Sequence, residues 1–168
     1  MILDRIKDRI GFDPLDRENQ LEAVKLNVEN ICYIHNPDKE VQLAAVKQNG
    51  ISIQYIQSPD KEVQLAAVKQ DAFSLGLINN PDKDVQLEAV KQNGFSLAFI
   101  HNPDKEVQLE AIKEDAHSIQ WIHNPDKEIQ MAAIEQSGYD IEVIAMCPNY
   151  ADFEEEIEKY LLCKDIIE

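Results

Sequence analysis

The chain has 168 residues, enough for one domain with a buried core, and we expect a single domain over residues 1–168. Its 32 acidic and 16 basic residues give a formal net charge of −16, which argues against direct binding to nucleic acid or to an anionic membrane and favours a partner with a basic surface. Residues 1–12 carry charges within their apolar run, and no apolar stretch reaches membrane-spanning length, so we expect neither a signal peptide nor a transmembrane helix. Cys32, Cys147 and Cys163 lack CxxC spacing, which is typical of a cytoplasmic protein without a structural zinc site.

A 22-residue repeat runs through most of the chain. Prolines occur at 37, 59, 81, 103 and 125, and Leu15 stands one step earlier, so six copies cover residues 15–146. One copy offers about five aliphatic side chains at roughly 1.5–3 kcal/mol each, which cannot offset an ordering cost of about 1.5 kcal/mol for each residue. The copies must therefore stack. We expect an all-α, right-handed superhelical solenoid of six coils, with helical end caps at residues 1–14 and 147–168.

Each copy predicts a long helix followed by a short one. In the second copy, Asn36 should cap the long helix and Pro37 should take its first helical position. About twelve helical residues follow, ending near Gly50, where glycine can adopt the left-handed conformation that closes helices; Gly94 and Gly138 hold the same place. Residues 52–56 then predict one further helical turn, of the 3₁₀ kind.

The phrase KEVQLAAVKQNG at residues 39–50 resembles bacterial and viral repeat families of the KEVxLAAVKQNG type. The Pro-Asp-x-Glu-Val-x-Leu opening of the copies also resembles the leucine-rich variant repeat. That resemblance covers residues 15–146 and implies an α-helix alternating with a 3₁₀ helix in a right-handed superhelix. The step of 22 residues is shorter than that family's unit, and no cysteine cluster precedes the array, so no iron–sulfur cofactor is implied. Neither resemblance brings a known activity.

Four positions hold the same residue in all six copies. With the proline counted as position 1, they are Asp at 2, Gln at 6, Ala at 9 and Ile at 20. On a helical wheel, position 6 lies among the apolar positions 5, 7, 9 and 10, and a buried amide without a partner costs a few kcal/mol. We therefore predict a structural ladder in which the glutamines bond backbone groups of the turns; the alternative is an exposed row of amides that reads a ligand. The ladder residues are Gln20, Gln42, Gln64, Gln86, Gln108 and Gln130.

The second element of the repeat varies at two positions. Positions 15 and 19 change from copy to copy, whereas positions 17 and 20 are always Ile or Leu and should face the core. The variable stripe has two interpretations: packing between coils, or a recognition strip on the inner wall of the solenoid. In the second interpretation the candidate partner-binding residues are Tyr33, Tyr55, Phe73, Phe95, Phe99, His117 and Trp121.

The long helix should present a charged, convex face to solvent through positions 4, 8 and 11. Asp at position 2 and the acids at position 4 form two rows of carboxylates, partly neutralised by Lys or Arg at position 3. These rows suggest an alternative function, an acidic nucleic-acid mimic that blocks a DNA- or RNA-binding protein such as a nuclease or host-defence factor.

Catalysis and metal binding have little support in the sequence. His35, His101 and His123 share position 21, but neighbouring coils stand about 8–10 Å apart, too far for one metal ion. The sequence has no nucleophile motif, phosphate loop or HExxH pattern. We therefore expect no enzyme and no cofactor, and we predict a non-catalytic interaction module or inhibitor that binds a protein partner through its variable face. A metal-binding protein or enzyme is the third hypothesis.

Overall fold

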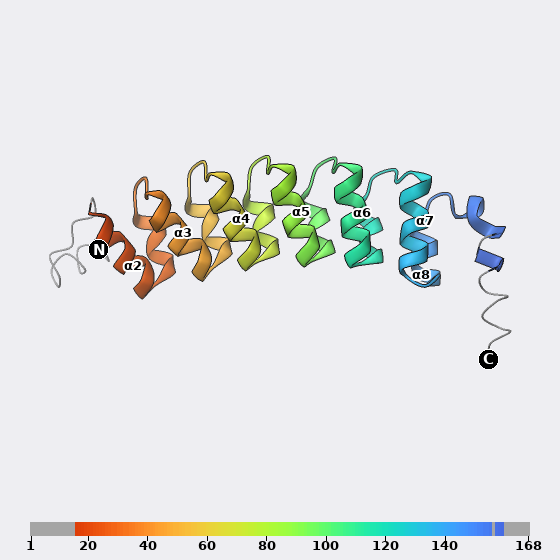
Figure 1. Cartoon of the computed structure of the whole chain (residues 1–168), viewed down its shortest axis with the longest axis horizontal. Coiled ribbons are helices and arrows are strands. Elements are labelled where there is room, and N and C mark those ends of the chain that lie inside the picture. The colour runs from red at the N-terminus through yellow and green to blue at the C-terminus, as the bar shows by residue number, and fades with distance from the viewer. Residues whose placement is uncertain (1–15, 156, 160–168) are drawn as a thin grey trace. The chain divides into compact units, whose positions relative to one another are not determined.

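The computed structural model describes residues 16–155 and 157–159, where α-helices alternate with 3₁₀ helices and no strand occurs (Figure 1). The predicted N-terminal cap, residues 1–14, lies outside the described residues. The described part of the predicted C-terminal cap contains one 3₁₀ turn followed by helical residues. In chain order the elements are α2 (Arg17–Leu26), η1 (Val28–Tyr33), α3 (Lys39–Gln48), η2 (Gly50–Tyr55), α4 (Lys61–Gln70), η3 (Ala72–Leu77), α5 (Lys83–Gln92), η4 (Gly94–Phe99), α6 (Lys105–Glu114), η5 (Ala116–Trp121), α7 (Lys127–Gln136), α8 (Ile141–Met146) and η6 (Tyr150–Phe153), where η marks a 3₁₀ helix.

The chain divides into two compact units, and the boundary between Ala89 and Val90 falls within α5. In the first unit α2 packs on α3 and α3 packs on α4, while η1, η2 and η3 form a second row beside them. In the second unit α6 packs on α7, and η4 packs on η5. Within each unit these coils thus contact their neighbours along the chain, as in other repeat proteins. The prediction of an all-helical repeat solenoid built from α and 3₁₀ helices is confirmed.

The start of each long helix differs from the prediction. The N-cap of α3 is Asp38, whose side chain accepts a hydrogen bond from the Val41 backbone N–H at 3.1 Å. Asn36 instead adopts a left-handed backbone with φ of 50°, as do the residues at position 22 of the next four copies. The prediction that Asn36 caps the helix was therefore wrong. The chain must turn sharply before the proline, Asn tolerates the left-handed conformation, and the capping role passes to the aspartate after the proline.

Two of the three glycines at position 14 have other roles than predicted. Gly138 has φ of 66°, and the Tyr139 N–H bonds the Ile134 carbonyl at 2.9 Å, so this glycine closes α7 as expected. Gly50 and Gly94 have no positive φ and begin the 3₁₀ helices. A Cβ at Gly50 would lie 2.5 Å from the Ala67 carbonyl oxygen of the next coil. Close contact between coils, rather than helix closure, requires glycine at Gly50.

The core lies between the two rows of helices in each unit. In the second copy Val41, Ala45, Val46 and Ile53 are at most 2% exposed, and the same positions are buried in the third, fourth and fifth copies. Burial of such side chains provides roughly 1.5–3 kcal/mol each, so the stacked coils, not the single copy, supply the stability. The invariant Ala at position 9 is buried in every copy, and the carbonyls of Ala67 and Ala111 lie close to Gly50 and Gly94 of the preceding coils.

The sixth copy departs from this pattern. Ile141, which the repeat predicts to be buried, is 79% exposed, whereas Val143 at the variable position 19 is fully buried. The prediction that position 17 always faces the core was therefore wrong at Ile141. The cause is local: Asp140 caps an α-helix here, and the wider α-helical turn rotates a different side chain inward.

The segment after α8 contacts the first residue of α7. Phe153 is 1% exposed, and the Lys127 ammonium lies 5.1 Å from its ring centroid. Burial raises the pKa of the Cys147 thiol, so Cys147 acts here as a neutral packing residue. Within the described residues, no helix is both long enough and apolar enough to cross a membrane.

Candidate recognition surface

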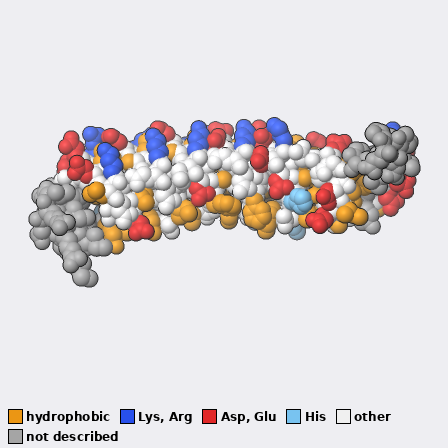
Figure 2. All heavy atoms as spheres, turned by 90° about the horizontal axis from the view of Figure 1, so that it is seen from below, with side chains coloured by type: hydrophobic (Ala, Val, Ile, Leu, Met, Phe, Trp, Pro, Cys, Tyr) orange, Lys and Arg blue, Asp and Glu red, His pale blue; other side chains and the backbone are white. Residues whose placement is uncertain are grey.

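Apolar side chains lie exposed on the 3₁₀ helices of both units. We call these side chains, at positions 15 and 19, the aromatic strip. Figure 2 shows hydrophobic side chains gathered along one edge of the molecule's visible face. Six of the seven residues predicted to bind a partner are 40–50% exposed, and His117 is half-buried. The strip consists of Tyr33, Ile51, Tyr55, Phe73 and Leu77 in the first unit, and of Phe95, Phe99, His117 and Trp121 in the second.

The 3₁₀ helices hold the strip outward because of how each of them begins. The side chain at position 13 accepts a hydrogen bond from the backbone N–H at position 15; Asn49 does so from Ile51 at 3.1 Å and Asp71 from Phe73 at 2.9 Å. Position 17 then faces the core and position 19 faces outward. Phe95 and Trp121 make an edge-to-face contact with centroids 5.0 Å apart, so strip residues touch between coils and still remain exposed.

The repeated glutamines lie where the long helices begin. In five copies the Nε2 atom of the glutamine donates to the carbonyl of the proline five residues earlier, at 2.7–2.9 Å. Gln20 is also buried. Residue 15, which stands where the other copies have the proline, lies outside the described residues. Gln130 makes a second bond, because its Oε1 accepts from the Asn149 backbone N–H at 3.2 Å. Each of these five glutamines therefore ties a helix to the turn of its own coil.

Three turn recesses open beside these glutamines. We use this name for the hollows at Gln42, Gln64 and Gln108, with volumes of about 250, 660 and 340 Å³. Each is lined by the glutamine, the proline and the position-19 side chain of one copy, together with the last residue of the preceding copy. These position-19 side chains are Tyr55, Leu77 and Trp121, so the recesses and the aromatic strip form one continuous surface within each unit. Sequence reasoning missed the recesses because they depend on how two coils are registered.

The same surface carries only one sign of charge. Between position 13 of one copy and position 2 of the next, residues 27–38, 49–60, 71–82, 93–104 and 115–126 contain no Lys or Arg. They do contain Glu29, Asp71 and Asp115 as well as the five aspartates at position 2, of which Asp60 and Asp126 are paired with lysines. His117 lies 3.2 Å from Asp115 through its Nδ1. These segments therefore contribute acidic side chains to the surface and no basic ones.

On the α-helices, by contrast, basic and acidic side chains occur together and form ion pairs between coils. Lys39 binds Asp60 at 3.0 Å and Glu62 at 2.5 Å in the next coil, and Lys105 binds Asp126 and Glu128 in the same way. Lys61 pairs with Asp84, one coil further along. The Glu62 and Asp60 carboxylates raise the pKa of Lys39, while the Val63 N–H and Lys39 lower the pKa of Asp60. The carboxylate rows predicted from positions 2 and 4 are thus largely paired with the lysines of position 3 in these coils.

A second contact between coils, at position 12, was also missed. Gln48 Nε2 donates to the Val24 carbonyl at 3.2 Å, and Gln136 Nε2 donates to the Lys113 carbonyl at 2.9 Å. In both cases a glutamine at the end of one α-helix satisfies a free carbonyl at the end of the preceding one. The signal was present, since position 12 is often Gln, but its partner lies in another copy and no single-copy pattern identifies it.

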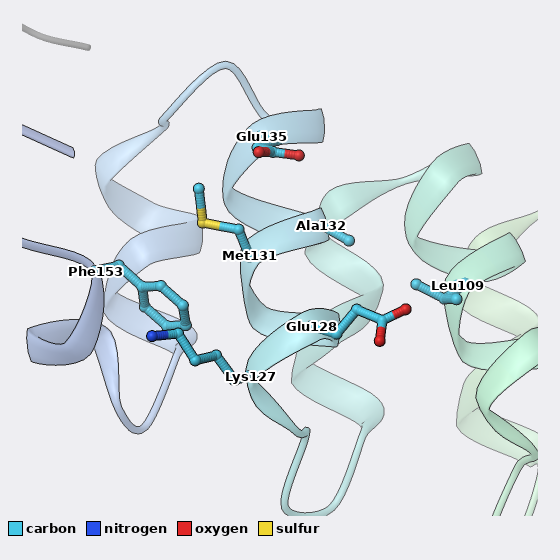
Figure 3. Close-up of a pocket in the computed structure, with 7 residues that line it drawn as sticks. All are labelled: Leu109, Lys127, Glu128, Met131, Ala132, Glu135 and Phe153. Carbon is cyan, nitrogen blue, oxygen red and sulfur yellow. The ribbon is translucent and has the colours of Figure 1, made fainter. Parts of the chain in front are cut away.

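A further hollow of about 560 Å³ lies between α6, α7 and the segment after α8 (Figure 3). Leu109, Met131 and Ala132 form its apolar part, Glu128 and Glu135 lie at its rim, and Lys127 lies against Phe153. Glu128, Ala132 and Glu135 stand at positions 4, 8 and 11 of the repeat, on the face of the α-helix that the sequence predicts to be exposed to solvent. The hollow therefore lies on that face, beside Phe153.

The histidines at position 21 do not converge on a metal site. His101 and His123 both line the recess at Gln108, and His35 lines the recess at Gln42. Among the residues that the structure describes, no group of three or more His, Cys, Asp and Glu side chains is arranged to hold a metal ion.

The fold and surface define a helical repeat protein whose coils combine one α-helix with one 3₁₀ helix. Residues 38–81, 60–103 and 82–124 each match the family described as Domain of unknown function (DUF4116), in segments that begin one repeat apart. Because these matches cover more than half of the chain, the protein belongs to this family. No curated protein and no solved structure matched the chain.

Proposed function

We propose that the chain is a non-catalytic repeat module that binds a protein partner through the aromatic strip and the turn recesses. The observation that carries this proposal is the exposure of the large apolar side chains at the variable positions of the repeat. Large exposed apolar patches on soluble proteins commonly mark interaction sites, and aromatic residues are the frequent anchors of interfaces. Binding alone would suffice for an adaptor or for an inhibitor that occupies its partner's surface.

The chemistry of the surface supports a basic partner. Residues 27–38 and the four equivalent segments lack Lys and Arg, so a cationic surface would meet no like charge there. The alternative, a nucleic-acid mimic, would rely on the carboxylates of positions 2 and 4. Several of these are already paired with lysines of the preceding coil, which reduces the negative charge that they offer to another molecule.

A pair of variants tests the proposal. The triple variant Tyr55→Ala, Phe99→Ala, Trp121→Ala removes three strip side chains, and the control variant Leu26→Ala, Ile141→Ala removes two side chains that are 78% and 79% exposed but lie outside the strip. Both tagged proteins are used to capture partners from cells that naturally produce the chain. We expect the triple variant to lose partners that the parent protein and the control variant retain. Equal recovery by all three proteins would refute the proposal.

A further inference from the structure

We propose that Asn93 is a site of spontaneous deamidation, which converts its side-chain amide into a carboxylate, and that Gln70 protects the equivalent Asn49 from the same reaction. The reaction needs only water and is independent of the protein partner proposed above. Three observations support it: asparagine precedes glycine at two places in the repeat, hydrogen bonds hold both asparagines before they react, and one contact between coils differs between the two places.

The two reactive pairs are evident in the sequence. Asparagine precedes glycine at Asn49-Gly50 and at Asn93-Gly94, and both pairs follow the same residues, Lys-Gln. Glycine favours deamidation because it has no side chain to shield its backbone nitrogen and because it adopts many backbone conformations. The four asparagines at position 22 each precede a proline, whose nitrogen carries no proton and cannot attack. The intrinsic reactivity of the two Asn-Gly pairs is therefore high and closely matched.

The reaction at Asn93 has two steps. The backbone nitrogen of Gly94 attacks Cγ of Asn93, so that a bond forms between this nitrogen and Cγ while the bond from Cγ to Nδ2 breaks. The proton of the glycine N–H leaves with the amide nitrogen as ammonia, and a five-membered succinimide ring remains. Water then opens the ring at either carbonyl and gives aspartate or isoaspartate. One water is consumed, one ammonia is released, and nothing is oxidised or reduced.

The start of η4 holds Asn93 in an unreactive conformation. Its side chain accepts the Phe95 backbone N–H at 3.0 Å. Closure of the ring requires the Cβ of Asn93 and the nitrogen of Gly94 to lie on the same side of the Cα–C bond, which the extended backbone of Asn93, with ψ of 108°, does not allow. The start of the 3₁₀ helix must therefore open before the reaction, and the rate depends on how easily this local opening occurs.

Opening is harder at Asn49, because a bond from the next coil holds its glycine. The Gly50 N–H donates to Oε1 of Gln70, at position 12 of the next copy, at 2.5 Å, and this bond must break before the nitrogen can attack. The residue equivalent to Gln70 in the other unit is Glu114. The three atoms nearest to a Cβ placed on Gly50 include Gln70 Oε1, whereas the three nearest to a Cβ on Gly94 include none of Glu114. Glu114 therefore does not repeat the close contact that Gln70 makes.

The repeat already accommodates one of the two products. Asp71 and Asp115 occupy the same position 13, and each accepts the backbone N–H two residues later at 2.9 Å. Conversion of Asn93 to aspartate thus keeps the cap of η4 and adds a carboxylate to residues 93–104, which contain no Lys or Arg. Isoaspartate instead inserts an extra carbon into the backbone before Gly94, where even an added Cβ would collide with the next coil. This second product should loosen the contact between the coils.

The test uses the folded full chain in mildly alkaline buffer, with peptide mapping by mass spectrometry to follow each asparagine separately. Because both pairs follow Lys-Gln, the same chain unfolded in urea reports the intrinsic rates, and we expect these to be nearly equal for Asn49 and Asn93. In the folded chain Asn93 should react at least about threefold faster than Asn49, as the loss of one hydrogen bond predicts. Equal rates in the folded chain, or no reaction of Asn93 while the unfolded chain reacts, would overturn the proposal.

Two substitutions at position 12 locate the cause of the difference. Gln70→Leu should raise the rate at Asn49 by at least about threefold and leave the rate at Asn93 unchanged. Glu114→Gln should slow Asn93 and leave Asn49 unchanged. The second asparagine in each variant is an internal control, because a general loss of stability raises both rates together. An equal rise at both sites in the Gln70→Leu variant, or an unchanged rate at Asn49, would refute protection by Gln70.

Discussion

The α-helices and the 3₁₀ helices differ in which of their side chains are bonded within the array. On the α-helices, repeated residues are engaged in the array: Asp60 caps α4, Lys39 binds the next coil and Gln64 bonds its own turn. On the 3₁₀ helices, the side chains at positions 15 and 19 vary between copies and remain 40–50% exposed in most of the described coils. The residues that repeat are thus those that bond within the array, and most of the residues that vary remain substantially exposed.

This difference explains how the repeat can keep one fold while its surface changes from copy to copy. A side chain that bonds the neighbouring coil must match that coil, which constrains it in every copy. A side chain that points away from both neighbours has no such constraint, and its exchange costs little stability. We therefore expect substitutions at the repeated positions of the α-helices to lower the free energy of unfolding, and substitutions in the aromatic strip to leave it nearly unchanged.

The largest expected effect tests the glutamine row. Replacing Gln64 by Leu removes the Nε2 donor and leaves the Pro59 carbonyl without its bond, which should lower the free energy of unfolding by about 2 kcal/mol. The measurement is urea unfolding followed by circular dichroism. The control is Gln54→Leu in η2, where an exposed glutamine is replaced by the same side chain and stability should stay within about 0.5 kcal/mol.

Equal stability of the Gln64→Leu variant and the parent protein would contradict the structural ladder. The repeated glutamines would then be explained only by the alternative interpretation, an exposed row of amides that contacts a ligand. A loss in the Gln54→Leu control as large as in the Gln64→Leu variant would show that leucine itself, and not the lost bond, causes the change.

A smaller effect is expected at the helix cap. Asp60 accepts the Val63 N–H at 3.0 Å and binds Lys39, and these contacts lower its pKa below the ordinary value of 3.8. Its contribution to stability is therefore complete above pH 3.8 and is lost as the pH falls through its lower, folded-state pKa. Replacing Asp60 by Ala should cost about 1 kcal/mol at pH 7, and the difference from the parent protein should narrow in acid.

Urea midpoints at pH 7 and at successive values below pH 4 measure this prediction. Asp60→Asn is the matched control, because asparagine retains a side-chain oxygen for the cap but carries no charge. It should lie between the parent protein and the Asp60→Ala variant at neutral pH. A destabilisation by Asp60→Ala that stays constant throughout the acid range would contradict a role for the ionised carboxylate.

The repeat period was sufficient to predict the stacked α and 3₁₀ helices, because apolar positions such as Val41 and Ile53 recur where a coil must meet its neighbours. The capping residue was not predictable in the same way. Asn36 and Asp38 flank one proline, and both types cap helices well, so only the left-handed backbone at Asn36 separates them.

Contacts between copies were harder to predict than contacts within one copy. Lys105 reaches Asp126 and Glu128, which are 21 and 23 residues later, and this pairing depends on the register of two stacked coils. The same register creates the turn recesses, so the sequence indicated the aromatic strip but not the hollows beside it. The repeat pattern wrongly predicted that Ile141 is buried, because an α-helix capped by Asp140 replaces the 3₁₀ helix in this copy.

The smallest expected effect concerns the strip itself. Tyr33 is 50% exposed at the end of η1, so Tyr33→Ser should change the free energy of unfolding by less than about 0.5 kcal/mol. Ile31 in the same 3₁₀ helix is fully buried, and Ile31→Ala provides the control that shows how the assay responds to lost packing, with an expected loss of about 2–5 kcal/mol.

This pair decides between the two interpretations of the variable positions. If Tyr33 mainly packs coil against coil, its loss should approach that of Ile31, since both side chains would then be removed from the same interior. If Tyr33 is kept for a partner, the variant should unfold at the same urea concentration as the parent protein and should bind captured partners less well. A loss above about 2 kcal/mol for Tyr33→Ser would assign the strip to packing, because a substitution at an exposed site does not reach that size.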